Sequence, residues 1–334
     1  AAPLATALAA LAFALWRIGP GDPLTDALEA RLVDARFVAR GARPAPETVA
    51  ILAVDEDALA RIGTGAPLRR ALAESVRRIA EAGAGAIALD FLLIDRGPAD
   101  SSLAAALSRS GRGVLAVAAA PDLSAPPRVA PETAAALVAS AYRVTVGRGA
   151  GPPPDPPHIL APAPPLAGAA SLGHVNLTRD PDRVARRLPL AMPLPGGGAL
   201  PALPVVAARL QLGLPPEAVT LWLDRGVAVG DVFTRAAPDG ALLIDHLGPA
   251  GTVETIPLGA ALAGGAAAAD LAARVDGRAV LIGATAESLG DLVATPFGAD
   301  VPGVETLAAA VATLIAGGGL TAGPVADAAT ALLA

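Results

Sequence analysis

TVAILAVDEDALARIGTGAPLRRALAESVRRIAEAGAGAIALD, from Thr48 to Asp90, gives the clearest indication of the fold of this chain. Thr48 to Val54 is a short apolar run with β-branched residues, and it is followed directly by acids, which is typical of a buried strand. Leu68 to Ala82 has the periodicity of an amphipathic helix, and Ala86 to Leu89 is a second apolar strand. Strand, helix and strand at this spacing predict a parallel βαβ unit.

The same alternation continues along the chain. The sequence HVNLTRDPDRVARRLPLAMPL predicts two strands joined by a turn over Arg179 to Arg183, because Asp-Pro-Asp supplies turn chemistry. We therefore predict an α/β fold with a mixed, largely parallel sheet flanked by helices. The further predicted helices are 101–110, 203–212 and 303–316, and the further predicted strands are 114–117, 227–229, 242–244 and 278–282.

Composition narrows the functions that are open to this chain of 334 residues. A net charge of -6 argues against nucleic acid as a partner, because binding a phosphate backbone needs clustered positive charge. All 25 basic residues are Arg, which excludes a Schiff-base or P-loop lysine, and the absence of Cys excludes disulfides and thiolate metal sites. Because 53% of residues are hydrophobic and only 2% aromatic, the core must be built from closely packed Ala, Val, Leu and Ile.

Both ends of the chain have the character of membrane helices. Residues 1–19 contain an uncharged apolar run that ends with Trp16 and Arg17, residues suited to a lipid–water boundary. We predict an N-terminal transmembrane helix here, truncated because spanning takes about 20 apolar residues. A cleaved signal peptide or an Ala-rich core helix is the alternative. Residues 324–334 are predicted to be the truncated start of a second transmembrane helix, after a Gly/Pro break.

One domain is expected between these ends, over residues 20–320. It begins after Gly19-Pro20-Gly21 with an amphipathic juxtamembrane helix over 22–40. Residues 121–168 are rich in Pro and predict a long surface excursion, because Pro does not sit in a central strand. A domain boundary in this region is the alternative interpretation.

Acidic side chains recur where the predicted parallel strands end. Asp55 and Asp57 follow the first strand, Asp90 follows the second, and Asp291 stands farther along the chain. Ligands of open α/β sheets bind at the carboxyl ends of the strands, so these carboxylates could converge on one pocket. Asp55, Asp57 and Asp90 are candidate ligands for Ca²⁺ or Mg²⁺, which prefer oxygen donors. The alternative is that Asp55 and Asp90 cap turns or accept backbone hydrogen bonds.

Several polar residues complete the set of candidates for ligand binding. Thr285, in GATAES after the last predicted strand, lies in a loop of small residues and hydroxyls, and Thr295 follows it in the chain. His174 and Asn176 stand in GHVN, although each of the three histidines also fits a structural role, since no pair has metal-ligand spacing. The arginines from Arg183 to Arg187 are expected to form a solvated face of the hairpin, with anion contact as the alternative.

Five stretches, read in order, resemble one family: DALEARLVDARF, AILAVDEDALARIG, RRIAEAGAGAIALDFLLID, GHVNLTRDPDRVARRLPL, and RAVLIGATAESLGDLVATPFGADVPGVETLAAAVATLIAGG. They are similar to the CHASE sensor family, second class, over about residues 26–319. The most specific element is the GATA, D, TPF and PGVE series from Gly283 to Glu305. This sequence departs from the family at Thr64 to Pro67, where a Trp-Pro-Trp-like stretch is usual, and at Leu307-Ala308, where a His-Ala step is common.

The resemblance implies an extracytoplasmic sensory domain of a bacterial adenylate cyclase, histidine kinase or related receptor in the cell membrane. It also implies a C-terminal continuation with further membrane helices and a cytoplasmic signalling module, so that this segment is not itself an enzyme. We expect a homodimer, contact with membrane lipid at both ends, and an unknown small ligand or ion. The alternatives are a metal-dependent phosphohydrolase-like enzyme that uses Asp55 and Asp57, although the Lys normal in such enzymes is absent, and a purely structural dimerisation domain.

Overall fold

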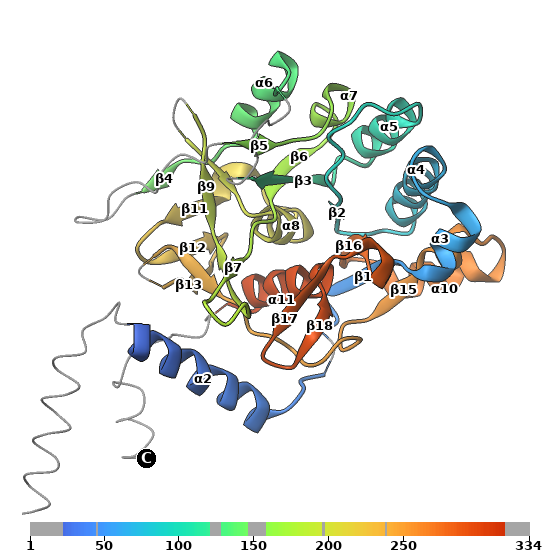
Figure 1. Ribbon diagram of the computed structural model, residues 1–334. Helices are drawn as coiled ribbons and strands as arrows, with labels where there is room; N and C mark the ends of the chain where they lie inside the picture. Colours follow the sequence, from blue (N-terminus) through green and yellow to red (C-terminus); the bar gives the residue numbers. More distant parts are fainter. Residues whose placement is uncertain are drawn as a thin grey trace, which may run out of the picture.

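The structure, a computed structural model, describes residues 23–44, 46–120, 128–145, 158–195, 198–237 and 239–317. Its centre is a seven-stranded sheet in the order β15-β1-β16-β2-β3, with β5 and β6 both paired to β3 (Figure 1). All pairs are parallel except that of β3 with β5. The predicted mixed, largely parallel sheet is therefore confirmed. Its strands are β1 (Val49–Val54), β2 (Ala86–Asp90), β3 (Gly113–Ala119), β5 (Ile159–Leu160), β6 (Ser171–His174), β15 (Thr255–Pro257) and β16 (Ala279–Ala284).

Helices cover both faces of this sheet, which explains why its strands are apolar throughout. Successive strand side chains point to opposite faces, so Ile51 belongs to the core under α8 and α11, whereas Leu52 belongs to the core under α4 and α5. The helices are α2 (Pro23–Arg40), α3 (Glu56–Ile62), α4 (Ala66–Glu81), α5 (Asp100–Ser110), α6 (Pro131–Ala139), α7 (Pro164–Ala167), α8 (Leu203–Gln211), α9 (Leu258–Leu262), α10 (Ala266–Val275) and α11 (Gly303–Ala316), with 3-10 turns at Pro216–Ala218 and Glu287–Leu289.

Smaller sheets extend the core under α8 and α11. One has the order β13-β12-β11-β4, another has the order β14-β8-β7, and β10-β9 and β17-β18 are two-stranded. The predicted hairpin is confirmed as β7 and β8, which pair in antiparallel fashion around the Asp-Pro-Asp turn. These strands are β4 (Val144–Thr145), β7 (Thr178–Arg179), β8 (Ala185–Pro189), β9 (Ala191–Pro193), β10 (Ala199–Pro201), β11 (Val219–Trp222), β12 (Gly226–Val229), β13 (Val232–Arg235), β14 (Ala241–Leu243), β17 (Leu292–Thr295) and β18 (Gly298–Pro302).

Close packing of small residues brings α8 and α11 against the sheet. A Cβ atom added to Gly283 of β16 would lie 2.5 Å from the Cβ of Val304 in α11, and one added to Gly173 of β6 would lie 2.6 Å from the Cα of Leu203 in α8. Both glycines therefore allow a helix to approach a strand more closely than a side chain would. This agrees with the expectation of a core with little aromatic bulk.

Replacing Gly283 with Ala is expected to lower the free energy of unfolding by about 1–3 kcal/mol, because the methyl group overpacks the contact between β16 and α11. Urea denaturation measures the change. Gly259→Ala is the matched control, since a Cβ atom at Gly259 in α9 would meet nothing within 4 Å. Equal stability of the two variants would contradict the prediction.

The N-terminal helix α2 lies beside the domain and outside its two main cores. Figure 1 shows it along one side of the molecule, beneath β7, β17 and β18. Only a small cluster holds its apolar side, formed by Val33 and Phe37 with Leu243, against which Phe297 packs. The predicted juxtamembrane helix over 22–40 thus forms as a helix that is docked on the domain.

The predicted transmembrane helices at 1–19 and 324–334 lie outside the described residues. Within the described ranges, no helix combines the length and the apolar character that crossing a bilayer requires. The proline-rich excursion over 121–168 is more structured than the sequence indicated. Its described parts contain α6, α7, β4 and β5. Two of these elements join the main domain, since β5 pairs with β3 in the main sheet and Leu166 of α7 is fully buried.

Candidate functional site

The carboxyl ends of the parallel strands form one edge of the main sheet, where several of the predicted residues lie. Strand register places Gly283 beside Asp90, and Val54 beside Ala284, which is followed by Thr285. His174 ends β6 beside Val117 of β3. The order β1-β16-β2-β3-β6 therefore brings the residues after five strands to the same edge of the sheet.

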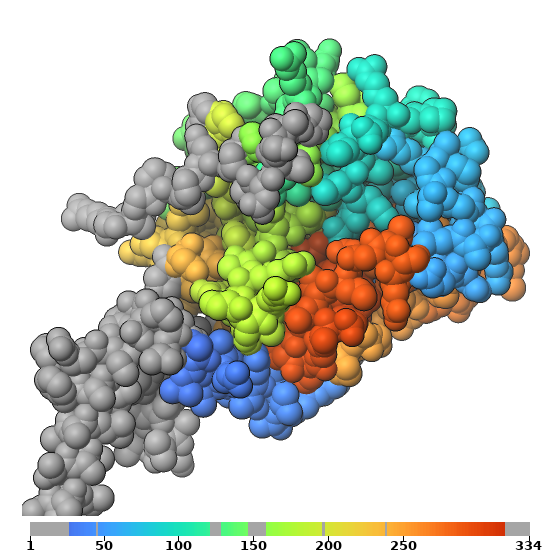
Figure 2. Space-filling view, in the orientation of Figure 1, coloured from blue at the N-terminus to red at the C-terminus, as the bar shows by residue number. Residues whose placement is uncertain are grey.

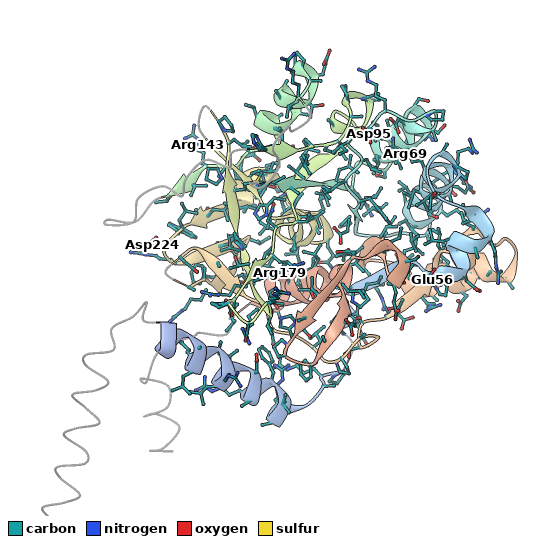
Figure 3. The ribbon with its side chains drawn as sticks, viewed as in Figure 1. Glu56, Arg69, Asp95, Arg143, Arg179 and Asp224 are labelled. Carbon is teal, nitrogen blue, oxygen red and sulfur yellow. The ribbon has the colours of Figure 1, made fainter. Side chains whose placement is uncertain are left out.

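Asp291 is close enough to Asp90 at this edge to influence the ionisation of the Asp90 carboxyl group. Removal of the Asp90 carboxyl from water, with the nearby negative charge of Asp291 as a second cause, raises the pKa of Asp90 to about 7. Burial also raises the pKa of Asp291, while the positive charge of Arg179 acts in the opposite direction. Arg179, which is labelled in Figure 3, ends β7.

The position of Asp291 is fixed by the first residue of α11. The Gly303 N–H donates a hydrogen bond of 2.9 Å to the Asp291 carbonyl. A Cβ atom on Gly303 would lie 2.7 Å from the Asp291 Oδ1 atom, so the carboxylate lies directly against the backbone at the helix N-terminus. This end of a helix favours negative charge. The N-terminus of α11 thus supports the Asp291 carboxylate. The Asp90 carboxyl group, in contrast, accepts no hydrogen bond from any described residue.

A carboxyl group with a pKa of about 7 can exchange a proton near neutral pH, and its anion can accept a cation. Strongly shifted carboxyl groups are concentrated at functional sites, because burial without a partner costs stability. Among the described residues, no group of three or more His, Cys, Asp or Glu side chains is arranged to hold a metal ion. Binding of Ca²⁺ or Mg²⁺ therefore stays a prediction from the sequence.

Replacing Asp90 with Asn is expected to raise the free energy of unfolding by about 4 kcal/mol at pH 8 and to leave it nearly unchanged at pH 3.5. The folded-state pKa of about 7 exceeds the usual 3.8, so the wild-type protein loses stability as pH rises through this window, and the amide does not. Urea denaturation at several pH values measures this difference. The exposed Asp231→Asn variant is the control, and a constant difference across pH would contradict the prediction.

Asp55 and Asp57 do not join this pair. Asp55 is the N-cap of α3, where its Oδ1 atom accepts a hydrogen bond of 2.8 Å from the Ala58 N–H. Asp57 is exposed and forms an ion pair of 2.9 Å with Arg61, one helical turn away. The structure thus corrects the predicted convergence of Asp55, Asp57 and Asp90, because a capping carboxylate and a helix-surface carboxylate point to their own partners. The same geometry gives no support to an Asp-x-Asp phosphohydrolase site.

Asn176, Thr295 and Thr285 form hydrogen bonds with backbone groups. Asn176 pairs with Ala119 through both amide atoms, at 2.8 and 2.9 Å, and so continues the ladder between β3 and β6. The Thr295 hydroxyl accepts a hydrogen bond from the Phe297 N–H in the turn between β17 and β18. Thr285 is half-buried, and its N–H donates to the Val54 carbonyl. The Asn176 and Thr295 side chains are thus accounted for by hydrogen bonds to the backbone, whereas the Thr285 contact involves only its main chain.

His174 is fully buried, and neither ring nitrogen has a hydrogen-bond partner among the described residues. Burial lowers its pKa to about 3, and the carbonyl of Pro189 opposes this only weakly, without reaching hydrogen-bond geometry. The imidazole is therefore neutral at physiological pH. Its predicted role in ligand binding is not supported by any contact in the described part of the chain.

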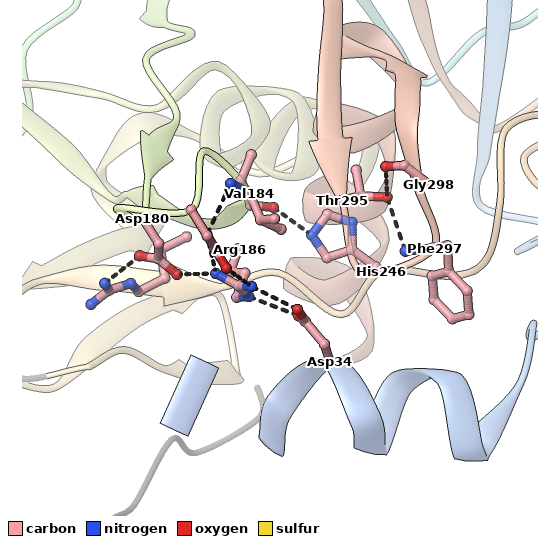
Figure 4. A network of polar contacts seen from close by, with 11 residues as sticks. Asp34, Asp180, Val184, Arg186, His246, Thr295, Phe297 and Gly298 are labelled. Carbon is pink, nitrogen blue, oxygen red and sulfur yellow. Dashed lines mark hydrogen bonds and ion pairs between the residues drawn. The ribbon is translucent and has the colours of Figure 1, made fainter. Parts of the chain in front are cut away.

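A buried arginine ties α2 to the domain, and sequence reasoning missed it. Arg186 of β8 is only 2% exposed and donates two hydrogen bonds to Asp34 of α2, at 2.7 and 2.6 Å (Figure 4). It also pairs with Asp180 at 2.6 Å and with Asp182 at 2.7 Å. These bonds raise the pKa of Arg186 further above its usual value, against the effect of burial. The expectation that Arg183 to Arg187 form a solvated face is wrong for Arg186.

A second set of contacts holds the C-terminal half of α2. The Phe37 ring meets the edge of His246, with centroids 5.7 Å apart, and Arg40 lies 4.9 Å above the Phe37 ring. Arg40 pairs with Asp245, which also binds Arg43 at 2.6 Å. Burial lowers the pKa of His246 to about 4, and its Nε2 atom is bonded to the Ala185 carbonyl. In the sequence, only the spacing of Asp180, Asp182 and Arg186 around a turn indicated the ion pairs of Arg186.

A short structural path joins the Asp90–Asp291 pair to the contacts that hold α2. β17 begins directly after Asp291, and its Ala294 forms a parallel bridge with Val184. Val184 lies in the hairpin turn that carries Asp182 and leads into Arg186. The carboxyl edge of the sheet is thus connected through β17 and the hairpin to α2.

Comparison with known proteins identifies the family. The model of the CHASE2 domain matches residues 6–332, and the chain belongs to this family. CHASE2 domains are extracytoplasmic sensory domains. The resemblance that the sequence motifs indicated is therefore confirmed. Neither curated proteins nor solved structures gave a match to the chain.

Proposed function

We propose that this chain is the sensing region of a bacterial transmembrane signalling receptor in the cell membrane, and that α2 carries its signal. The observation that supports this most is the buried Arg186–Asp34 pair, because it ties the helix nearest the N-terminal apolar segment to the domain. A surface ion pair would hold such a helix only weakly, whereas breaking a buried pair costs several kcal/mol. A rearrangement of the hairpin must therefore move α2 or break this pair.

The stimulus acts, in this proposal, at the Asp90–Asp291 pair. Ionisation or neutralisation of Asp90 changes the repulsion between two carboxylates, and Asp291 directly precedes β17. A stimulus can shift the domain only if it favours one of two arrangements. The two arrangements would differ in how β17 and the hairpin hold α2. The unknown small ligand or ion that the sequence implied would be recognised by these two carboxyl groups.

The output is proposed to be a cytoplasmic adenylate cyclase, histidine kinase or related module fused to this segment. The match to the CHASE2 domain supports this, because the resemblance to that family implies such a receptor. Pairing of two copies stays a prediction from the sequence.

Thiol labelling in intact cells tests the location. The chain contains no Cys, so a single Ser101→Cys variant on the exposed start of α5 gives one labelling site. A membrane-impermeant maleimide is expected to label it in cells with a permeable outer envelope and an intact cytoplasmic membrane. A cytoplasmic protein with an exposed Cys is the control and should react only after lysis. Labelling of Ser101→Cys only after lysis would overturn the proposal.

Hydrogen exchange tests the link between the carboxyl pair and α2. Asp90→Asn is expected to change the protection of amides in α2, whereas the exposed Asp231→Asn should not. If neither variant changes α2 while Asp90→Asn still alters stability, the pair is not coupled to the helix and the signalling path proposed above is wrong.

A further inference from the structure

Helix α2 has two apolar sides, and only one of them is used by the domain. Val33 and Phe37 face the domain and are 9% and 3% exposed. Leu28 and Leu32 are 60% and 56% exposed. With 3.6 residues per turn, positions 28, 32, 35 and 39 fall on one side of the helix, and positions 33 and 37 fall on the opposite side. We call Leu28, Leu32, Ala35 and Ala39 the outer face of α2.

Unpaired positive charge flanks the outer face. Arg31 and Arg36 are exposed, lie on either side of it, and have no ion-pair partner among the described residues. Two further arginines in the described part of this end, Arg40 and Arg43, both form ion pairs with Asp245. Glu29, the one acid beside the outer face in the described part of α2, is half-buried.

The pattern of charge distinguishes between two partners that could cover the outer face, a second copy of the chain and a lipid surface. In a parallel pair of copies joined along the outer face, Arg31 of one helix and Arg36 of the other would occupy flanking positions that face each other, and like charges there repel. Ala35 and Ala39 would also fill only a small part of such a seam. Leucines flanked by arginines instead suit a boundary between acyl chains and anionic headgroups.

We propose that the outer face of α2 lies on the membrane surface and binds anionic phospholipid headgroups, with Leu28 and Leu32 inserted at the headgroup boundary and Arg31 and Arg36 on the phosphates. The sequence allows this orientation, because Gly19-Pro20-Gly21 separates α2 from the predicted N-terminal membrane helix and so permits a change of direction. Figure 2 shows α2 along the border of the protein, below the hairpin and the β17–β18 pair. The inference rests on the proposed function, since it requires a domain held at a membrane.

The consequence is that α2 is held from two sides. The domain binds it through Arg186–Asp34 and Phe37, and the bilayer binds it through the outer face. A shift of the hairpin would then change the angle or depth of α2 against the lipid. The composition of the membrane would accordingly affect which arrangement of the sensor is favoured.

Spin labelling of the full chain in nanodiscs tests the proposal. A label on Leu32→Cys reports depth through its relative accessibility to oxygen and to a water-soluble nickel chelate, and a label on the exposed Val138→Cys of α6 is the control. In nanodiscs that contain phosphatidylglycerol, the Leu32 label is expected to be shielded from the chelate. The ratio of shielded to water-exposed helix should exceed that in pure phosphatidylcholine by about thirtyfold, which corresponds to two arginines near an anionic surface.

Charge variants sharpen the test. Arg31→Gln with Arg36→Gln is expected to abolish the dependence on phosphatidylglycerol. Arg70→Gln with Arg109→Gln removes the same charge from exposed positions on α4 and α5 and should leave the dependence unchanged. Equal exposure of the Leu32 label to the chelate in both lipids would overturn the proposal. Shielding in pure phosphatidylcholine with dipolar coupling between labels would also overturn it, because that result assigns the face to a second copy.

Carbonate extraction of the same samples distinguishes a failure of the proposed lipid contact from a failure of the proposed receptor function. If the chain stays in the bilayer while the Leu32 label remains exposed to water, only the assignment of the outer face fails. If the chain is extracted from the bilayer, both the receptor function and the lipid contact fail.

Discussion

Replacing Arg186 with Met is expected to lower the free energy of unfolding by about 3–5 kcal/mol, as is usual when one partner of a buried ion pair is removed. The loss is large because Arg186 is 2% exposed and binds Asp34, Asp180 and Asp182 at once. Asp180 is itself 7% exposed and would keep only Arg187, at 2.6 Å, among the ion pairs described here. Urea denaturation measures the loss of stability, and hydrogen exchange should show faster opening of α2.

Two comparisons make this prediction specific. Arg61→Met removes an arginine that is 74% exposed, so its effect should stay within about 0.5 kcal/mol. Asp34→Asn should cost less than Arg186→Met, because Arg186 keeps Asp180 and Asp182, yet it should still increase exchange in α2. If Asp34→Asn left α2 fully protected, the Arg186–Asp34 pair would not be what holds the helix.

Replacing His174 with Leu is expected to stabilise the protein increasingly as pH falls, by about 3 kcal/mol at pH 4 relative to pH 7. His174 has a folded-state pKa of about 3 and an ordinary value of 6.5. Below pH 6.5 the unfolded chain therefore binds a proton that the folded protein excludes, and the wild-type protein loses about 1.4 kcal/mol per pH unit. Leucine is similar in size and has no proton to bind, so the variant escapes this loss.

The measurement is the difference in unfolding free energy between variant and wild type from pH 7.5 to 4. Only the difference is informative, because Asp90 contributes with the opposite sign and His246 contributes with the same sign in both proteins. The slope should be near zero above pH 7 and steep between pH 6 and 4. A difference that does not vary with pH would show that the His174 ring titrates normally in the folded state.

Much of the fold followed from local patterns. Short apolar runs bounded by acids or glycine predicted β1, β2, β3 and β16, and helical periodicity predicted α4, α5, α8 and α11 with bounds close to those observed. The turn chemistry of Asp-Pro-Asp predicted the β7–β8 hairpin. The proline-rich region was less predictable, because a two-residue strand such as β5 has no periodicity to detect.

The candidate site was predicted only in part. Asp90 and Asp291 were recognised because acids at strand ends share one edge of a parallel sheet. Asp55 and Asp57 follow the same rule in the sequence, but one caps α3 and the other pairs with Arg61. Arg186 resembles its neighbours Arg183 and Arg187 in the sequence, and nothing local distinguishes the one that is buried.

The family, the parallel α/β architecture and the apolar character of both ends could be read from the amino-acid sequence alone, since motifs and periodicity are properties of neighbouring residues. The three-dimensional packing was needed to show which carboxylates meet, which arginine is buried, and which side of α2 stays free. These depend on residues as far apart as Asp34 and Arg186, 152 positions in the chain, because burial and ion pairing are set by contacts that form when distant segments pack together.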